Sequence, residues 1–232
     1  MNIALLGNGK TGSRVADLVR EHPGIAVTAF NRSRPPECEA LREHDIIISF
    51  LPGDAFVEYI PELIASGRPV VSGSTGFDWP EGREVFSLRI AGESLIWIHA
   101  NNFSLGMNLI HEMIQIMGMA ATVYDEHSFS IHEIHHSQKK DAPSGTALAW
   151  KRWLDHPASI TSERTGDVTG EHTLTLDTPF EKISIHHMAK NRQIFASGAL
   201  WTASRLLSGQ DSLEPGLYDM QRFVLSQIQS QN

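Results

Sequence analysis

The residues from Glu133 to Ala147, which read EIHHSQKKDAPSGTA, hold the side chains best suited to acid–base chemistry in this chain. Two adjacent imidazoles can exchange a proton near neutral pH, and the two lysines that follow can bind carboxylate or phosphate oxygens. Residues 128–134 alternate as a strand does, so His135 and His136 are expected to face opposite ways. The run therefore predicts a site that binds a small anion and protonates it.

A helix start is predicted at the end of the same run, with Asp141 or Ser144 as its cap. The first N–H groups of a helix have no partner within it and attract anions, and Gly145 would let a ligand approach the backbone closely. Lys139 and Lys140 lie just before this point. Because ammonium groups and a helix start both favour an anion, together they predict one anion-binding site.

A metal site is the competing interpretation, since His132, Glu133, His135 and His136 are close in sequence. Alternation would place His132 and His136 on one face of a strand and His135 on the other, which makes the convergence of three ligands awkward. Adjacent histidines also occur at strand ends with no chemical role. The two lysines and the glycine at the predicted helix start favour the anion site, and we predict no metal.

The chain opens with a nucleotide-binding pattern, in which a short apolar run at 3–6 leads into a glycine-rich turn and an amphipathic stretch at 13–19. The glycines of such a turn let a pyrophosphate approach the start of the following helix. The turn supplies the first cofactor candidates, which are Gly7, Asn8, Gly9, Lys10, Thr11 and Gly12.

The end of the second apolar run, at 25–30, predicts which nicotinamide cofactor is preferred. In NADH enzymes an acidic residue follows this strand and binds the ribose 2′-hydroxyl. Asn31 and Arg32 stand there instead, and a neutral amide beside a cation suits the 2′-phosphate of NADPH. NADPH is therefore predicted as the preferred cofactor, with NADH possible and Lys10 as a second cation. The alternative is that Arg32 and Arg34 are only solvated loop charges.

Strands and helices are predicted to alternate further along the chain, with strands at 45–51, 68–72 and 95–100 and a helix at 55–65. Such alternation implies a parallel, Rossmann-like sheet, and ligands bind at the carboxyl ends of its strands. The small and polar residues at those ends are further cofactor candidates: Gly73, Ser74, Thr75, Ala100, Asn101, Asn102 and Phe103.

The rest of the chain predicts a smaller α+β domain with a mixed or antiparallel sheet. Strands are expected at 173–176 and 182–187, helices at 201–207 and 217–229, and a mobile polar loop at 159–170. His186 and His187 lack a nearby lysine or capped glycine and are interpreted as strand positions without a chemical role. We predict three segments: a dinucleotide-binding domain at 1–102, a substrate-binding and oligomerisation domain at 103–195, and C-terminal helices at 196–232 that return to the first domain.

Composition excludes several classes of protein. The net charge is −8, from 19 basic and 27 acidic side chains, which argues against broad nucleic-acid binding. The single cysteine, Cys38, excludes a disulfide framework and fits a reducing cytoplasm. No apolar run is long enough for a membrane span, and no signal-peptide pattern opens the chain. We therefore expect a cytoplasmic protein with no membrane partner.

Together these motifs resemble the 4-hydroxy-tetrahydrodipicolinate reductase (dihydrodipicolinate reductase) family along essentially the whole chain. The run from Glu133 to Ala147 is similar to that family's most specific motif. Further similar segments are Gly73-Ser74-Thr75-Gly76-Phe77, Asn102-Phe103-Ser104-x-Gly106-x-Asn108, Gly166-Asp167-x-x-Gly170-Glu171-His172 and Gly216-Leu217-Tyr218-Asp219-Met220. The chain departs from the family at Thr11, where a Met is usual, and at Ser49-Phe50-Leu51, where Asp-Phe-Thr is usual.

The resemblance implies a homotetramer that reduces a cyclic dicarboxylate with NAD(P)H in lysine and diaminopimelate biosynthesis. It implies that His135 is the general acid and that Lys139 acts in substrate binding and catalysis. The dicarboxylate contacts that it implies are His136, Lys139, Ser144, Gly145 and Thr146. The glycine-rich turn, Gly73 to Thr75 and Ala100 to Phe103 match the family's cofactor contacts, to which the resemblance adds Arg192 and Phe195. Asn31 departs from the acidic residue expected after the second strand. Two alternatives stay open, an amino-acid dehydrogenase on the same scaffold and a non-catalytic nucleotide sensor.

Overall fold

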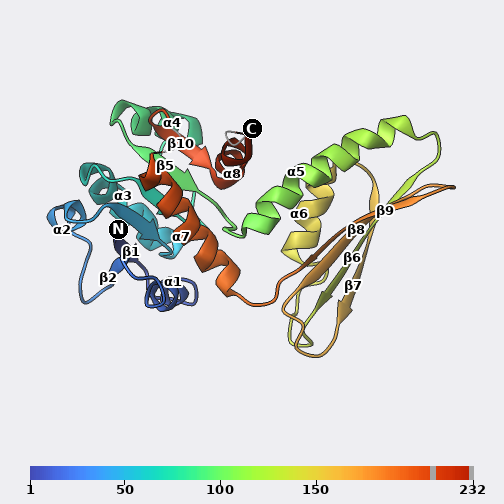
Figure 1. Ribbon diagram of the computed structural model, residues 1–232, viewed down its shortest axis with the longest axis horizontal. Coiled ribbons are helices and arrows are strands. Elements are labelled where there is room, and N and C mark those ends of the chain that lie inside the picture. Colours follow the sequence, from blue (N-terminus) through green and yellow to red (C-terminus); the bar gives the residue numbers. More distant parts are fainter. Residues whose placement is uncertain (210–212, 230–232) are drawn as a thin grey trace. The chain divides into compact units, whose positions relative to one another are not determined.

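Two sheets organise the chain, each within its own unit (Figure 1). The computed structural model describes residues 1–209 and 213–229. Unit 1 comprises Met1–Leu105 and Gln193–Asn232, and unit 2 comprises Gly106–Arg192. Residues 210–212 and 230–232, which belong to the predicted C-terminal segment, lie outside the described residues.

Unit 1 contains a parallel sheet, which confirms the predicted Rossmann-like fold. Its strands in spatial order are β10 (Gly216–Asp219), β5 (Ile96–His99), β4 (Val70–Ser72), β3 (Ile46–Ser49), β1 (Asn2–Leu6) and β2 (Ala26–Phe30). Every neighbouring pair is parallel. Continuous apolar runs such as the one in β3 suit such a sheet, because its strands are buried on both faces.

Helices cover both faces of this sheet (Figure 1). One face packs against α1 (Gly12–Val19), α7 (Gln193–Ser208) and α8 (Met220–Gln229). The other packs against α2 (Cys38–Arg42), α3 (Gly53–Ala65) and α4 (Arg83–Gly92). Among the described residues, no helix is both long enough and apolar enough to cross a membrane.

Unit 2 contains a mixed sheet with two helices on one face, as predicted for the smaller domain. The strand order is β7 (Ala158–Arg164), β6 (Ser128–His135), β8 (Glu171–Asp177) and β9 (Lys182–Met188). Strand β6 is parallel to β7 and antiparallel to β8, which is antiparallel to β9. Helices α5 (Leu105–Ala120) and α6 (Gly145–Leu154), with the short 3₁₀ helix Ala121–Val123 after α5, complete the core.

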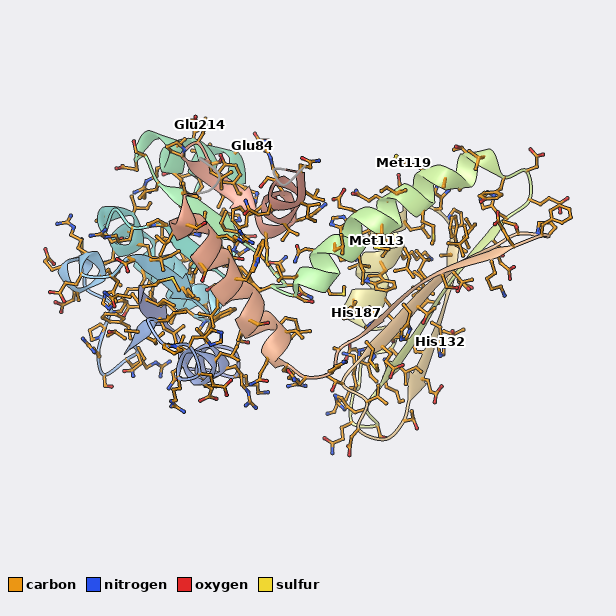
Figure 2. All side chains as sticks on the ribbon, viewed as in Figure 1. Glu84, Met113, Met119, His132, His187 and Glu214 are labelled. Atoms are coloured by element: carbon orange, nitrogen blue, oxygen red, sulfur yellow. The ribbon has the colours of Figure 1, made fainter. Side chains whose placement is uncertain are left out.

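The two faces of this sheet differ in polarity. The face toward α5 and α6 is apolar, with Ile131 and Leu174 fully buried. The outer face carries polar side chains, of which His132 bonds Thr161 at 2.8 Å. His132 lies on this outer face and His187 on the inner one, as the alternation of each strand requires (Figure 2).

Two local predictions were wrong. The polar stretch 159–170 was expected to be a loop, but residues 158–164 form β7, whose ladder joins it to β6. An edge strand needs no apolar alternation, so its polar side chains hid it. Residues 217–219 were expected to be helical, but they belong to β10, and α8 begins only at Met220. Pairing with a distant strand overrides local propensity in both cases.

Candidate active site

The glycine-rich turn lies where the sheet of unit 1 reverses its strand order, between the carboxyl ends of β1 and β3. Gly7 has φ of +91°, and a Cβ there would lie 2.8 Å from the backbone of Phe50. A Cβ on Gly12 would lie 1.9 Å from the carbonyl oxygen of Gly7. In contrast, a Cβ on Gly9 would meet no atom within 4 Å. The turn is therefore closed toward the protein and open at Gly9, where a ligand can approach.

A pocket of about 260 Å³ in unit 1 brings the predicted cofactor segments together. It is lined by Thr11, Phe50, Gly73, Thr75, Ala100, Asn101, Asn102, Phe103 and Phe195. Phe50, which sequence analysis did not propose as a contact, packs edge-to-face on Phe103 with ring centroids 5.9 Å apart. An aromatic wall beside an open glycine turn fits a flat ring joined to a pyrophosphate, so the residues fit a nicotinamide dinucleotide.

Several predicted contacts do not line this pocket. The side chain of Ser74 is buried, and its hydroxyl lies 3.3 Å from that of Ser49. This pair joins the loop after β4 to the end of β3, which gives Ser49 a structural role. Asn8, Lys10 and Arg192 are exposed outside the pocket lining.

Asn31 shapes a tight turn after β2. Its Oδ1 accepts hydrogen bonds from the Ser33 backbone at 2.9 Å, the Ser33 hydroxyl at 2.7 Å and the Arg34 backbone at 3.1 Å. The Arg34 guanidinium lies over the Phe30 ring, 5.0 Å from its centroid. Arg32 is exposed at the corner of this turn. The turn thus presents cations while the Asn31 oxygen is engaged internally.

In unit 2, the histidine–lysine run follows the end of β6. His135 is the last residue of the strand and is buried on its inner face, while His136 is half-buried just beyond it. The backbone N–H of Lys139 donates to the His136 carbonyl at 3.1 Å. The Lys139 ammonium bonds both carboxylate oxygens of Asp141 at 2.8 Å. Lys140 is exposed.

Ser144 is the N-cap of α6, as predicted. Its hydroxyl accepts the N–H of Ala147 at 3.1 Å and lies 3.2 Å from Nε2 of His172. Because Ser144 is buried, its side chain positions the helix start rather than facing solvent. Gly145 is exposed, and a Cβ there would meet no atom within 4 Å. The backbone at Gly145 and Thr146 is therefore the accessible part of this helix start.

Glu133 is a fully buried carboxylate on the inner face of β6. Its Oε1 accepts hydrogen bonds from the Ser144 backbone at 2.9 Å, the Ser162 hydroxyl at 2.7 Å and the Arg164 guanidinium at 2.9 Å. Burial would raise the pKa of Glu133, but these bonds outweigh it and hold the pKa at about 2. Glu133 is therefore a carboxylate at any physiological pH.

Two histidines face the second oxygen of this carboxylate. The Oε2 atom lies 3.3 Å from Nδ1 of His135 and 3.6 Å from Nε2 of His172. Burial lowers the pKa of His172 to about 4, and it also lowers the pKa of His135, where the Glu133 charge acts in the opposite direction. The ligand atoms of Glu133, His135 and His172 lie within 4.8 Å of one another, as a metal would need. We interpret them as a cluster of buried polar side chains around one carboxylate, because Arg164 already neutralises its charge. The absence of metal stays a prediction.

Acid is expected to destabilise both units through buried histidines. Burial also lowers the pKa of His99, which bonds Ser72 in unit 1, to about 4. The unfolded chain takes up these protons near pH 6.5, so each histidine contributes stability above that pH that is lost as the pH falls toward 4. The loss is about 3 kcal/mol per histidine. Urea unfolding at pH 7 and 4.5 measures it. His99→Gln should reduce the change in the free energy of unfolding of unit 1 between pH 7 and 4.5. His22→Gln, at an exposed position, should leave that change as it is. An equal change with pH in both variants would contradict the assignment to His99.

Comparison with known proteins places these features in a family context. Residues 106–224 match the family model described as dihydrodipicolinate reductase, C-terminus. A 4-hydroxy-tetrahydrodipicolinate reductase of Christiangramia forsetii is 35% identical over 226 residues, covering 89% of this chain and 92% of the relative. One of Syntrophus aciditrophicus is 30% identical, covering 93% of this chain and 94% of the relative. A solved dipicolinate-bound dihydrodipicolinate reductase from Paenisporosarcina sp. TG-14 shares the fold, with a TM-score of 0.79 over 96% of this chain and 98% of that chain, at 20% identity.

Proposed function

The chain belongs to the dihydrodipicolinate reductase family, and from this premise we propose that it reduces 4-hydroxy-tetrahydrodipicolinate to tetrahydrodipicolinate with a nicotinamide cofactor. The reaction belongs to lysine and diaminopimelate biosynthesis, consumes a proton and releases water. The observation that carries the proposal is His135, a buried histidine at the end of β6. Lys139 and the start of α6 at Gly145 follow it within ten residues of the chain. This run combines a proton donor with groups that bind carboxylates.

Each part of the site has a defined task in this reaction. When bound, the nicotinamide supplies the hydride. His135, as the imidazolium, gives the proton on its Nε2 to the substrate as negative charge develops there. The Lys139 ammonium exchanges Asp141 for a substrate carboxylate, and the backbone N–H groups of Gly145 and Thr146 bind carboxylate oxygens. His136, half-buried just after β6, adds a further polar contact to the substrate.

We further propose that NADPH is the preferred cofactor and that the domain at 1–102 binds it together with Phe103 and Phe195. The turn at 31–34 supports this preference, because it carries two arginines and no acidic side chain. The 2′-phosphate of NADPH adds negative charge that the exposed Arg32 can bind, whereas the 2′-hydroxyl of NADH gains little from a cation. Lys10, exposed in the glycine-rich turn, adds positive charge on the same unit.

Two substitutions test the cofactor preference. Arg32→Ala should lower kcat/KM for NADPH by about 10-fold or more through loss of a charge-assisted bond, with little change for NADH. Asn31→Asp keeps an acceptor for Ser33 and Arg34 but adds a negative charge, so it should shift the preference toward NADH. Initial rates with both cofactors measure this ratio. Arg20→Ala, exposed on unit 1 and paired with Asp17, is the control; equal ratios in all variants would overturn the assignment.

A coupled assay tests the reaction itself. The substrate is generated in place from pyruvate and aspartate semialdehyde by the preceding synthase, and NADPH oxidation is followed. We expect rapid oxidation that depends on the synthase. Oxidised cofactor reduced by an amino acid would indicate a dehydrogenase instead, and NADPH binding without turnover, with the synthase shown to be active, would indicate a sensor.

The assembly and the compartment are also proposals. A homotetramer is expected from the resemblance to the family. A cytoplasmic location is supported by the single free cysteine, Cys38. Sedimentation of the purified chain would measure the assembly directly.

A further inference from the structure

Glu133 holds a buried charge that the proposed reaction does not itself require. Burying an isolated carboxylate costs free energy of folding, so a buried carboxylate needs hydrogen-bond donors around it. Its Oε1 has three donors, from Ser144, Ser162 and Arg164. Its Oε2 is buried and has no partner that meets hydrogen-bond geometry in this structure. The donors therefore fix the carboxylate and leave one oxygen aimed elsewhere.

That oxygen faces the ring of His135. Glu133 and His135 are two residues apart on β6, so both side chains lie on the inner face of the sheet. The Oε2 atom lies 3.3 Å from Nδ1 of His135, which is also buried and otherwise unpartnered. This separation is within hydrogen-bond range, and a rotation of the ring that brings Nδ1–H into line with Oε2 would complete the bond. A carboxylate only accepts, so Nδ1 must carry the hydrogen.

A glycine packs beside the opposite edge of the His135 ring. A Cβ on Gly170, at the turn into β8, would lie 3.1 Å from Nε2 of His135. With glycine there, no side chain covers this nitrogen from that direction. The ring thus has one nitrogen directed at Glu133 and the other beside Gly170, where any larger residue would crowd it.

We propose that Glu133 is a positioning residue for the proton donor: its Oε2 accepts Nδ1–H of His135, which directs Nε2–H to the substrate. The same carboxylate stabilises the imidazolium that donates the proton, and Arg164 and Ser162 keep the carboxylate in place. This is the logic by which an acid or base is oriented by a third group. The inference rests on the proposed function for the reaction, but the hydrogen position on His135 is a property of the protein alone.

The charge of Glu133 acts on His135 among several other groups. Arg164 on β7, His172 on β8 and Lys139 in the following loop oppose the charged ring, whereas Asp141 favours it. His187 on β9 pairs with His172 across the β8–β9 ladder. Removal of the Glu133 charge should therefore lower the pKa of His135 by about one unit or more.

Nuclear magnetic resonance of ¹⁵N-histidine-labelled protein, without substrate, tests the proposal in Glu133→Gln. The Gln carbonyl must accept from the three donors that Oε1 now serves, so its NH₂ group turns toward His135. Nδ1 then becomes an acceptor, and the neutral ring should change from the Nδ1–H to the Nε2–H tautomer. In parallel, kcat should fall at least about tenfold with little change in KM. The loss of kcat with rising pH should also begin at lower pH.

Controls separate this role from a structural one. Glu163→Gln makes the same change at an exposed position of β7 beside Arg164 and should leave the His135 tautomer and kcat unchanged. If Glu133→Gln does not fold because Arg164 loses its counter-charge, the double variant Glu133→Gln/Arg164→Gln removes both charges, and the same tautomer change is expected. An unchanged tautomer and pKa of His135 in a folded variant would overturn the proposal. A changed tautomer in a chain without reductase activity would support the contact and reject only the proposed reaction.

Discussion

Replacement of His135 by Gln should lower kcat by about 10²–10⁴-fold while the affinity for NADPH stays within about twofold of the unmodified chain. Gln is close in size but cannot transfer a proton near neutral pH. His135 is buried at the end of β6 in unit 2, whereas the glycine-rich turn and the pocket that fit the cofactor lie in unit 1. The kinetic loss should therefore appear without a loss of cofactor binding, as measured by single-turnover kinetics and NADPH titration.

His132→Gln is the matched control for this experiment. His132 is on the same strand, but it points to the outer face and bonds Thr161 there. Its replacement should leave kcat within about twofold. Loss of NADPH binding in His135→Gln, or equal losses of kcat in both variants, would assign His135 a structural role.

Replacement of Lys139 by Met should lower kcat/KM by about 10²–10³-fold, the second largest effect that we expect. Met keeps most of the length of the side chain and removes its charge. The Lys139 ammonium is bonded to Asp141 and partly exposed, with 22% of the side chain accessible. An anionic substrate can therefore compete for it. Without it, the Asp141 carboxylate would repel the substrate, so KM should rise and kcat should fall.

Lys140→Met removes the same charge one residue away, at an exposed position with no ion pair among the described residues. If Lys139 acts through a specific contact, Lys140→Met should change kcat/KM by less than about threefold. Comparable losses in the two variants would mean that general positive charge, and not the position of Lys139, attracts the substrate. Initial rates over a range of substrate concentrations distinguish these cases.

The parts of the fold that follow from local pattern could be predicted from sequence. The apolar runs of unit 1 and the glycine turn indicate a parallel sheet, because central strands such as β3 and β4 are buried on both faces. Strand β7 could not be recognised, since most of its side chains are polar and its pairing with β6 makes it a strand. Strand β10 is short and lies at an edge of the sheet in unit 1, where pairing with β5 decides its conformation.

The candidate site divides in the same way. Local spacing predicted an anion site in this run, with Asp141 or Ser144 as the helix cap, and the resemblance to the family singled out His135 and Lys139. The structure places the cap at Ser144. The partners of Glu133 could not be predicted, since Arg164 reaches it across a separation of 31 residues through the parallel pairing of β6 and β7. Similarly, Phe50 lines the cofactor pocket because β3 ends beside β1, a neighbourhood that sequence order does not reveal.

The most direct test of the central claim follows an isotope from cofactor to product. NADPH that carries deuterium at both hydrogens of nicotinamide C4 is mixed with the chain and with substrate made by the synthase, and tetrahydrodipicolinate is analysed by mass spectrometry. We predict a product that carries a single deuterium, formed with the unmodified chain and strongly reduced with His135→Gln. Oxidation of NADPH that leaves no deuterium in this product, with the synthase shown to be active, would contradict the account.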